Sequence, residues 1–324
     1  MKNIAIIGAG GIAGKMADTI NAVDGANAYA IASRSLEKAE EFAAKHNFDV
    51  AYGSYEELVA DPKIDLVYVA TPHSHHYKCM KMCLEAGKKV LCEKAFTVNA
   101  DEAKEILAMA KEKNLLVAEA IWTRYLPARK MINDLIDAGE IGERVSMMAN
   151  LGGNLTGRDR IEKKELAGGA LLDMGVYVLT LMRMFFPENI VETSSMVDQE
   201  ADGVDKLESL CLRLEERKMV NLVCTTRSMM RSGATISGTK GFIQFVGATN
   251  PESILVCRPR ENYEKVYEIP KQINGFEYEL EACMKAIDDG KIECEQMPHS
   301  EIIFMMELMD SFRKSWGYEI PEVR

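Results

Sequence analysis

From Met1 to about Ala120, short apolar runs alternate with longer segments in which apolar residues recur every three or four positions. The short runs are rich in β-branched residues and predict strands, whereas the longer segments have the period of helices. Strands that alternate with helices favour right-handed crossovers and a parallel doubly wound sheet. The expected strands are Ile4–Ile7, Asn27–Ala32, Ile64–Ala70, Lys89–Cys92 and Leu115–Glu119.

Several of the helices between these strands have clear start signals. Ser54 stands three positions before Glu57, the spacing of a capping box, and Asn99 precedes another helical segment. The expected helices are Gly11–Ala22, Leu36–Lys45, a short one after Ser54, one that ends near Ala86, and Asn99–Lys113.

After Trp122 the pattern changes to strands joined by short turns, which predicts an antiparallel sheet. We therefore expect an α/β protein of two domains. Residues 1–121 form a doubly wound parallel sheet, and residues 122–324 form an α+β domain with an open, mostly antiparallel sheet. The elements expected there are helices at 126–138, 168–186, 276–288 and 300–316, and strands at 144–150, 190–197, 207–214, 220–226, 234–237 and 242–246.

Composition narrows the class of protein. The 324 residues carry a net charge of −11, which disfavours nonspecific binding to nucleic acid or to anionic membranes. No signal peptide precedes the first strand, and no apolar run reaches about 18 residues, so neither export nor a membrane span is expected. The eight cysteines contain no C-x-x-C pair and are typical of buried thiols in a cytoplasmic protein.

The first strand is followed by Gly8, Gly10 and Ala13 in the order G-x-G-x-x-A, and a helix begins directly afterwards. Gly8 permits a tight turn, Gly10 lets the backbone approach a pyrophosphate, and Ala13 allows close packing of helix on strand. Glycines also make ordinary turns, but placed between a strand and a helix they favour a Rossmann-type dinucleotide site, with the phosphates at the helix N-terminus.

The residues after the second strand bear on the choice of dinucleotide. An acidic side chain about 20 residues past the glycines would bind the ribose 2′-hydroxyl of NAD, but Ser33 and Arg34 stand there instead. A guanidinium can receive a 2′-phosphate in bidentate fashion. We expect NADP, with NAD as the alternative; Arg34 can also be read as a solvated residue at a helix start.

Lys94 directly follows a buried strand, at the sheet edge where open α/β sheets bind ligands. Partial desolvation there would lower the pKa of its ammonium toward a value useful for proton transfer, although an exposed loop lysine fits the same pattern. Thr71–His76 would reach the same edge.

With these segments identified, the chain resembles the Gfo/Idh/MocA family of nicotinamide-dependent oxidoreductases. Four motifs occur in the family's order: GAGGIAG, TPHSHH, AGKKVLCEK and GGALLDMGVY. EAIWTRYLP and LLDMGVY look most like the branch of dihydrodiol dehydrogenases and NADP-dependent xylose dehydrogenases, in which a tyrosine replaces the usual histidine. The sequence departs from the family's E-K-P motif at Ala95, where a cis proline would fix the turn.

The resemblance implies roles for individual residues. Lys94 would lie near the nicotinamide and the substrate hydroxyl, and Asp173 and Tyr177, four positions apart on one helical face, would line the same cavity. Tyr177 would carry a proton only if a cation such as Lys94 lowered its pKa. The implied catalytic and substrate residues are Lys94, Asp173, Tyr177 and Arg124. Together with the glycine loop and the residues after the second strand, the expected cofactor residues are Gly8, Gly10, Gly11, Ile12, Ser33, Arg34, Thr71, Pro72, His76, Glu93 and Lys94.

The expected activity is hydride transfer between NADP and a secondary alcohol of a sugar, cyclic polyol or dihydrodiol. A catalytically silent dinucleotide-binding regulator of the same fold is the alternative. His73-Ser74-His75 also resembles the H-x-H of metal-dependent hydrolases, but His46, His76 and His299 are not placed to complete a site, so no metal is expected. A sheet face without a covering helix predicts a homodimer through the C-terminal sheet.

Overall fold

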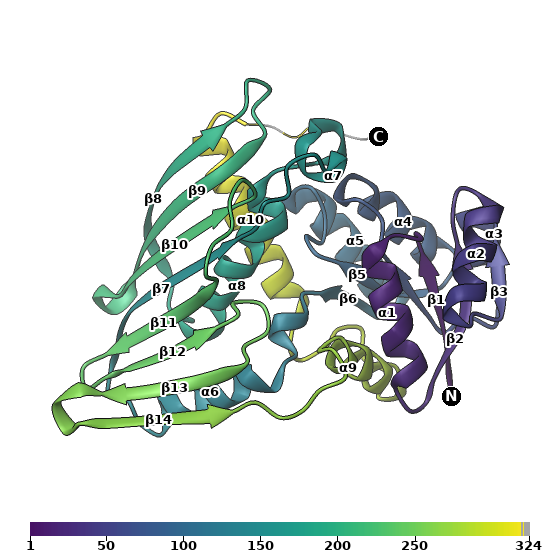
Figure 1. Cartoon of the computed structure of the whole chain (residues 1–324). Helices are drawn as coiled ribbons and strands as arrows, with labels where there is room; N and C mark the ends of the chain where they lie inside the picture. Colours follow the sequence, from purple (N-terminus) through teal and green to yellow (C-terminus); the bar gives the residue numbers. More distant parts are fainter. Residues whose placement is uncertain (319, 321–324) are drawn as a thin grey trace. The chain divides into compact units, whose positions relative to one another are not determined.

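The computed structural model describes residues 1–318 and 320, and the chain folds into two compact units (Figure 1). The first unit comprises Met1–Trp122 and Gln272–Asp310, and the second comprises Thr123–Lys271 and the described part of Ser311–Pro321. The first change of unit falls after Trp122. The return of Gln272–Asp310 to the first unit differs from the expected single C-terminal domain.

The first unit is built on a parallel sheet of six strands in the order β3-β2-β1-β4-β5-β6, as the alternating pattern predicts. Its strands are β1 Lys2–Ile7, β2 Ala26–Ala32, β3 Val50–Tyr52, β4 Leu66–Val69, β5 Lys89–Glu93 and β6 Val117–Ala120. The four residues of β4 and the last four of β1 are buried, because helices cover both faces of the sheet.

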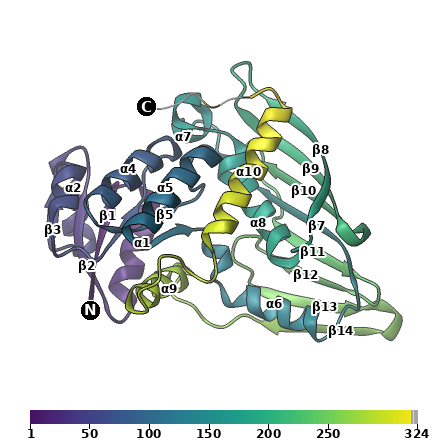
Figure 2. The ribbon, with the colours of Figure 1, turned by 180° about the vertical axis from the view of Figure 1, so that it is seen from behind.

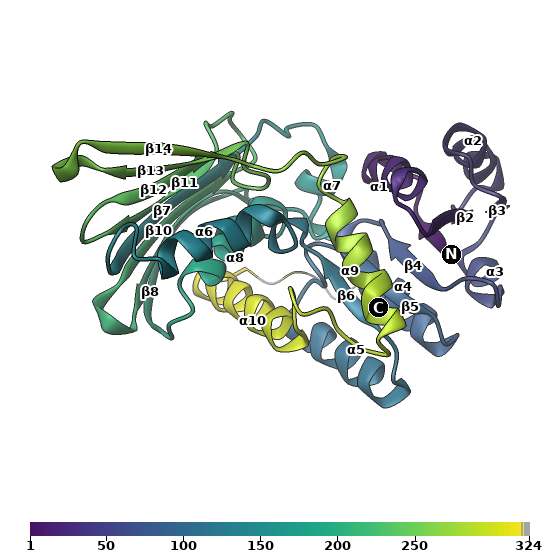
Figure 3. The same ribbon diagram turned by 90° about the horizontal axis from the view of Figure 1, so that it is seen from below.

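Helices α1 and α2 lie on one face of this sheet, and α4 and α5 lie on the other (Figure 3). The expected caps are confirmed, since Ser54 Oγ accepts from Glu57 N at 3.2 Å and Asn99 Oδ1 from Glu102 N at 2.8 Å. The helices are α1 Gly11–Ala22, α2 Leu36–His46, α3 Tyr55–Ala60, α4 His73–Glu85, α5 Ala100–Lys113 and α9 Glu277–Asp288.

A ring contact and a backbone hydrogen bond connect Gln272–Asp310 to the rest of the first unit. Phe276, next to α9, stacks on Trp122 with ring centroids 4.6 Å apart, and Val117 N of the edge strand β6 donates to Ile292 O at 3.0 Å. The long helix α10, His299–Ser315, starts in this unit and ends in the second.

The second unit contains an eight-stranded sheet in the order β14-β13-β12-β11-β7-β10-β9-β8. All neighbouring strands are antiparallel except β7 and β10, which confirms the mostly antiparallel sheet. The strands are β7 Arg144–Gly152, β8 Ile190–Gln199, β9 Asp205–Leu214, β10 Met219–Thr225, β11 Gly233–Gly238, β12 Phe242–Val246, β13 Ser253–Arg258 and β14 Tyr263–Glu268. The last two were not expected.

Helix α8, Val176–Phe185, packs on one face of this sheet (Figure 2). A π-helical turn, Leu171–Gly175, precedes it, so the expected helix 168–186 is not uniform. The stretch Lys164–Phe185 is long and apolar enough to cross a membrane by length and composition, but 78% of its most apolar window is buried inside the fold, as in the core helix of a globular domain. Helix α6, Pro127–Asp137, and the short α7, Asp159–Glu162, complete the unit.

The opposite face of the sheet carries an uncharged row that crosses all eight strands. Direct cross-strand partners project from the same face. The row, in sheet order, is Val266, Leu255, Gln244, Thr235, Met148, Asn221, Cys211 and Ser194. Met148 is 67% exposed and Val266 is 56% exposed.

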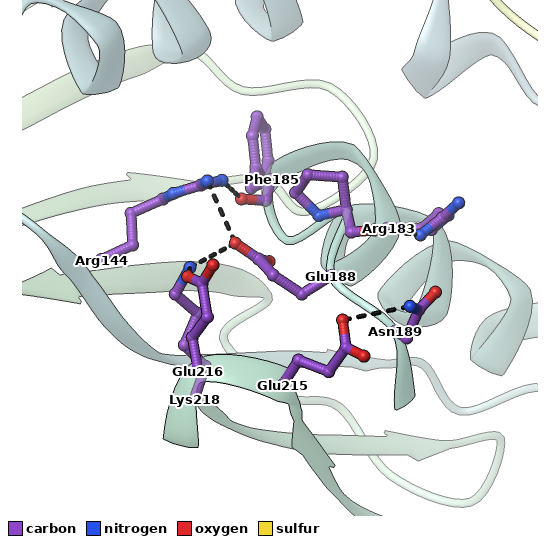
Figure 4. A network of polar contacts seen from close by, with 9 residues as sticks. Arg144, Arg183, Phe185, Glu188, Asn189, Glu215, Glu216 and Lys218 are labelled. Carbon is purple, nitrogen blue, oxygen red and sulfur yellow. Dashed lines mark hydrogen bonds and ion pairs between the residues drawn. The ribbon is translucent and has the colours of Figure 1, made fainter. Parts of the chain in front are cut away.

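A polar network ties the start of β7 and β10 to the segment after α8 (Figure 4). The Glu188 carboxylate accepts from Lys218 Nζ and, at 3.3 Å, from Arg144 Nη2. The side chains of Glu188 and Lys218 are only 10% and 6% exposed, so this is a largely buried ion pair.

Candidate active site

In the first unit, four strand ends line up at one edge of the parallel sheet. Ile7 of β1 lies opposite Ala32 of β2 and Val69 of β4, and Val69 lies opposite Cys92 of β5. The chain order reverses at β1 and β4, so the loops after these strands surround the position at which doubly wound sheets bind ligands.

The glycine loop after β1 has the geometry that its sequence predicts. Gly8 has φ +101°, and a Cβ atom there would lie 2.8 Å from Ala70 O, so only glycine fits. A Cβ at Gly10 or Gly11 would meet no described atom within 4 Å, so space is open beside the backbone at the start of α1, where a helix N-terminus favours an anion. Ile12 in the first turn is half-buried, and Ala13 is fully buried.

The loop after β2 places Ser33 and Arg34 at the same edge. Ser33 is half-buried and Arg34 is exposed, and Ser35 caps α2. The pKa of His75 is lowered by burial and then by the charge of Arg34. The guanidinium charge therefore acts on the first turn of α4, which follows the loop that contains Thr71 and Pro72, both half-buried.

Lys94 follows β5, and buried side chains hold its backbone. The Glu93 carboxylate is 7% exposed; one oxygen accepts from the Tyr68 hydroxyl, and the other from Lys94 N at 3.3 Å. The Lys94–Ala95 peptide bond is cis, although alanine replaces the proline of the family motif.

The next two residues are held in the same way. Ala95 O lies 2.9 Å from His76 Nδ1, and Phe96 N donates to Glu119 Oε1 at 3.0 Å. His76 Nε2 lies 2.9 Å from Thr71 O, so this fully buried ring bridges the loops after β4 and β5. Burial lowers the pKa of His76, against the two carbonyl contacts, which favour the charged ring. Consecutive hydrogen bonds along the loop preorganise the backbone that carries Lys94.

A third buried carboxyl group lies near Glu93 and Glu119. Glu279 of α9 is fully buried, and neither of its oxygens has a hydrogen-bond partner among the described residues. Burial, and then the charges of Glu93, Cys294 and Glu119, raise the pKa of Glu279 well above its ordinary value. This upward shift of the pKa favours the protonated form of Glu279 in the folded protein.

We expect Glu279→Gln to stabilise the protein at neutral pH. In the unfolded chain Glu279 ionises near its ordinary pKa of 4.5, whereas burial in the folded chain raises this pKa. The unfolded state therefore becomes more favourable as the pH rises above this value, and glutamine removes that pH-dependent loss. Thermal unfolding from about pH 5 to about pH 8 should show a Tm advantage for the variant that grows with pH.

Glu85→Gln at the exposed end of α4 is the matched control. It should leave the pH dependence of Tm unchanged. An advantage of Glu279→Gln that stays constant or shrinks as the pH rises would show that Glu279 is ionised in the folded state.

The second unit contains three further residues expected at the site: Asp173, Tyr177 and Arg124. Asp173 lies in the π-helical turn and Tyr177 in the first turn of α8, so a change of helix type separates them. Such turns are frequent at functional sites. Asp173 and Arg124 are each 4% exposed, whereas Tyr177 is half-buried. Arg160 Nη1 donates to Asp173 Oδ1 at 2.7 Å.

Sequence reasoning missed Tyr68, Glu119, Glu279 and Arg160. For Glu119 a signal existed, since a carboxyl group in a strand covered on both faces needs a buried partner. Arg160 gave no signal, because its contact depends on how the loop around α7 folds. Glu93 and His76, expected to contact the cofactor, also make contacts within this unit: Glu93 accepts from the Tyr68 hydroxyl of β4, and His76 lies against the carbonyls of Ala95 and Thr71.

Comparisons with known proteins agree with this architecture. Residues 2–120 match the model of an oxidoreductase family with an NAD-binding Rossmann fold, and residues 130–244 match the GFO/IDH/MocA C-terminal domain. The human trans-1,2-dihydrobenzene-1,2-diol dehydrogenase is 33% identical over 299 residues, covering 90% of each chain. The D-xylose 1-dehydrogenase (NADP(+)) of Hypocrea jecorina is 36% identical over 329 residues, covering 90% of this chain and 83% of the relative.

Solved structures match over nearly the whole length. KijD10, a 3-ketoreductase from Actinomadura kijaniata solved with NADP, has a TM-score of 0.89 at 23% identity and 97% coverage of both chains, which shows the shared fold. The two family models cover the larger part of the chain, and the dehydrogenases above exceed 30% identity over most of it. The chain therefore belongs to the Gfo/Idh/MocA family of oxidoreductases.

Proposed function

We propose that this chain is an NADP-dependent dehydrogenase that acts on a secondary alcohol of a sugar, cyclic polyol or dihydrodiol. The main support for the proposal is the position of Lys94. Hydrogen bonds hold the backbone of its loop, and this loop follows β5 at the same edge of the sheet as the glycine loop after β1. Two relatives are named for oxidation of a dihydrodiol and of D-xylose, which supports this substrate class.

In the proposed reaction the protein binds, orients and deprotonates the alcohol. Lys94, paired with Tyr177, removes the hydroxyl proton as the carbonyl forms, and Asp173 accepts a hydrogen bond from a second hydroxyl. Arg124 is the weaker candidate for the same substrate. A bound nicotinamide supplies the hydride acceptor. The residues proposed to hold it are those of the glycine loop and of the loops after β2, β4 and β5.

The direct test is titration of ligand-free protein with NAD and NADP separately, followed by absorbance assays across polyols, aldoses and dihydrodiols. Tighter binding of NADP together with turnover of an alcohol supports the proposal. Binding without turnover of any of these substrates would favour the regulator, and binding of neither dinucleotide would overturn both.

Arg34 provides a separate test of the cofactor preference. Arg34→Ala should weaken NADP binding by about tenfold to a hundredfold, because a charge-assisted hydrogen bond to the 2′-phosphate is lost, and should leave NAD binding within a few-fold. Isothermal titration with both dinucleotides measures this. Lys45→Ala, at the far end of α2, is the control and should change neither affinity. An equal loss for NAD and NADP would contradict the assignment.

We also propose a homodimer through the uncharged row of the second unit's sheet. Charged residues are depleted at the centre of protein interfaces, and this row contains none. Met148→Glu at its centre should produce monomers in sedimentation at micromolar concentration. Met229→Glu, at an exposed loop methionine outside the row, should leave the dimer intact. A monomeric unmodified protein would refute the proposal.

A further inference from the structure

The ion pair between Arg160 and Asp173 is unequal in exposure. Arg160 Nη1 lies 2.7 Å from Asp173 Oδ1, and the Asp173 side chain is 5% exposed whereas that of Arg160 is 43% exposed. A carboxylate that is buried to this degree needs a compensating charge, and here a side chain that reaches solvent supplies one.

The backbone around Arg160 is anchored to the glycine pair before the π-helical turn. Ile161, the next residue, is 1% exposed, and its carbonyl accepts from Gly169 N at 3.0 Å. Gly168 N donates to Lys163 O at 3.1 Å. A Cβ atom at Gly168 would lie 2.5 Å from Ile161 O, so a larger residue would push the Arg160 segment away.

Gly169 allows a close contact with Asp205, which binds the π-helical turn. It has φ +128°, and a Cβ atom there would lie 2.3 Å from Asp205 Oδ1. Asp205 Oδ2 in turn accepts from Leu171 N at 2.6 Å, which fixes the first residue of the turn that carries Asp173. The two glycines thus hold Arg160 and the Asp173 turn against each other.

Other titratable groups of this unit surround the turn. Strand β9 contributes Asp205 and Glu208, β10 contributes Cys224, and α8 contributes Tyr177. Burial, and then the charge of Asp205, raise the pKa of Glu208. Arg160 places a positive charge directly against the Asp173 carboxylate.

We infer that Arg160 is a positioning residue, which keeps Asp173 ionised and orients its carboxylate. The glycine pair Gly168-Gly169 permits the close backbone contacts that hold Arg160 in this position. The effect of Arg160 on turnover rests on the proposed function, in which Asp173 binds a substrate hydroxyl. The effect of Arg160 on the ionisation of Asp173 is independent of that function.

The test compares Arg160→Met and Arg160→Lys with the unmodified enzyme over a range of pH. Removing a cation in contact with an aspartate raises the pKa of that aspartate by about 1–3 units, so the acid limb of kcat/KM should move to higher pH by that amount in Arg160→Met. At the acidic end this should appear mainly as a higher KM. Arg160→Lys should recover most of the change, and the NADP dissociation constant should stay within a few-fold.

Two further variants separate positioning from a general effect of the loop. Arg158→Met changes an exposed arginine of the same loop and should leave the pH profile unchanged. In an Asp173→Asn background the acid limb assigned to Asp173 should be absent, and adding Arg160→Met should shift no remaining limb.

A readout without turnover keeps the inference separate from the proposed function. Carbon-13 NMR of the aspartate carboxyl groups, assigned with Asp173→Asn, should show Asp173 titrating at higher pH in Arg160→Met than in the unmodified protein. An unchanged Asp173 titration overturns the inference, even if the enzyme is active. An inactive unmodified protein in which Asp173 shifts as expected would overturn the proposed function and leave the inference standing.

Discussion

Replacing Lys94 with methionine is expected to lower kcat by about a hundredfold to ten-thousandfold, the usual contribution of a positioned general base. Methionine keeps most of the length and apolar contact of the side chain but removes the amine that accepts the hydroxyl proton. The backbone of the loop should remain in place, because Glu93, His76 and Glu119 bind main-chain groups of residues 94–96. NADP affinity should therefore stay within a few-fold.

Stopped-flow and steady-state absorbance with the best alcohol substrate would measure the loss, and fluorescence titration would measure NADPH binding. Lys89→Met, at the other end of β5, is the matched control and should leave both unchanged. Full activity of Lys94→Met would show that Lys94 does not accept the hydroxyl proton. Loss of NADPH binding together with activity would assign Lys94 to cofactor binding instead.

The first unit follows its sequence pattern closely, because each of its signals is local. The expected helix Gly11–Ala22 agrees with α1, and the caps at Ser54 and Asn99 lie where their side chains predict. Strand β3 has only three residues, all half-buried, which is too short for a period to show.

In the second unit, local sequence patterns do not predict every element. Strands β13 and β14 pair with each other at the sheet edge, and β14 carries charged residues at several positions, so its pattern resembles a loop. The return of Gln272–Asp310 to the first unit involves contacts between residues far apart in the chain, such as Phe276 with Trp122 and Ile292 with Val117. No periodicity records such a contact.

The candidate site divides in the same way. Spacing alone predicts the glycine loop and the place of Lys94 at a strand end, because both follow from strand, turn and helix in succession. The side chains that hold the Lys94 loop come from β4, β6 and α4, and Arg160 reaches Asp173 across a loop. Their roles require the fold.

Removing the carboxylate of Glu188 is expected to cost about 3 kcal/mol of unfolding free energy, at the lower end of the range for a broken buried ion pair. Glu188→Ala would leave Lys218, 6% exposed, with Glu216 as its remaining ion-pair partner, and Arg144 without a carboxylate acceptor at 3.3 Å (Figure 4). Burial lowers the pKa of Lys218, but the hydrogen bonds to Glu188 and Glu216 raise this pKa by more than burial lowers it, so the net shift is upward.

The sign of that shift sets the pH range of the effect. A lysine whose pKa is raised by folding contributes its full stabilisation below its ordinary pKa of 10.5 and loses it only as the pH rises through the folded value. The cost of Glu188→Ala should therefore be constant across neutral pH. Urea denaturation should show a lower midpoint with an unchanged slope.

The exposed pair of Glu192 and Arg213 offers a matched control in the same sheet. These side chains are 65% and 49% exposed, so Glu192→Ala should cost less than about 1 kcal/mol. Glu188→Gln, which keeps an acceptor oxygen without the charge, should fall between the two alanine variants. The free energy of unfolding decides between the two cases. If Glu188→Ala lowers it no more than Glu192→Ala does, then Glu188 does not compensate the buried charge of Lys218.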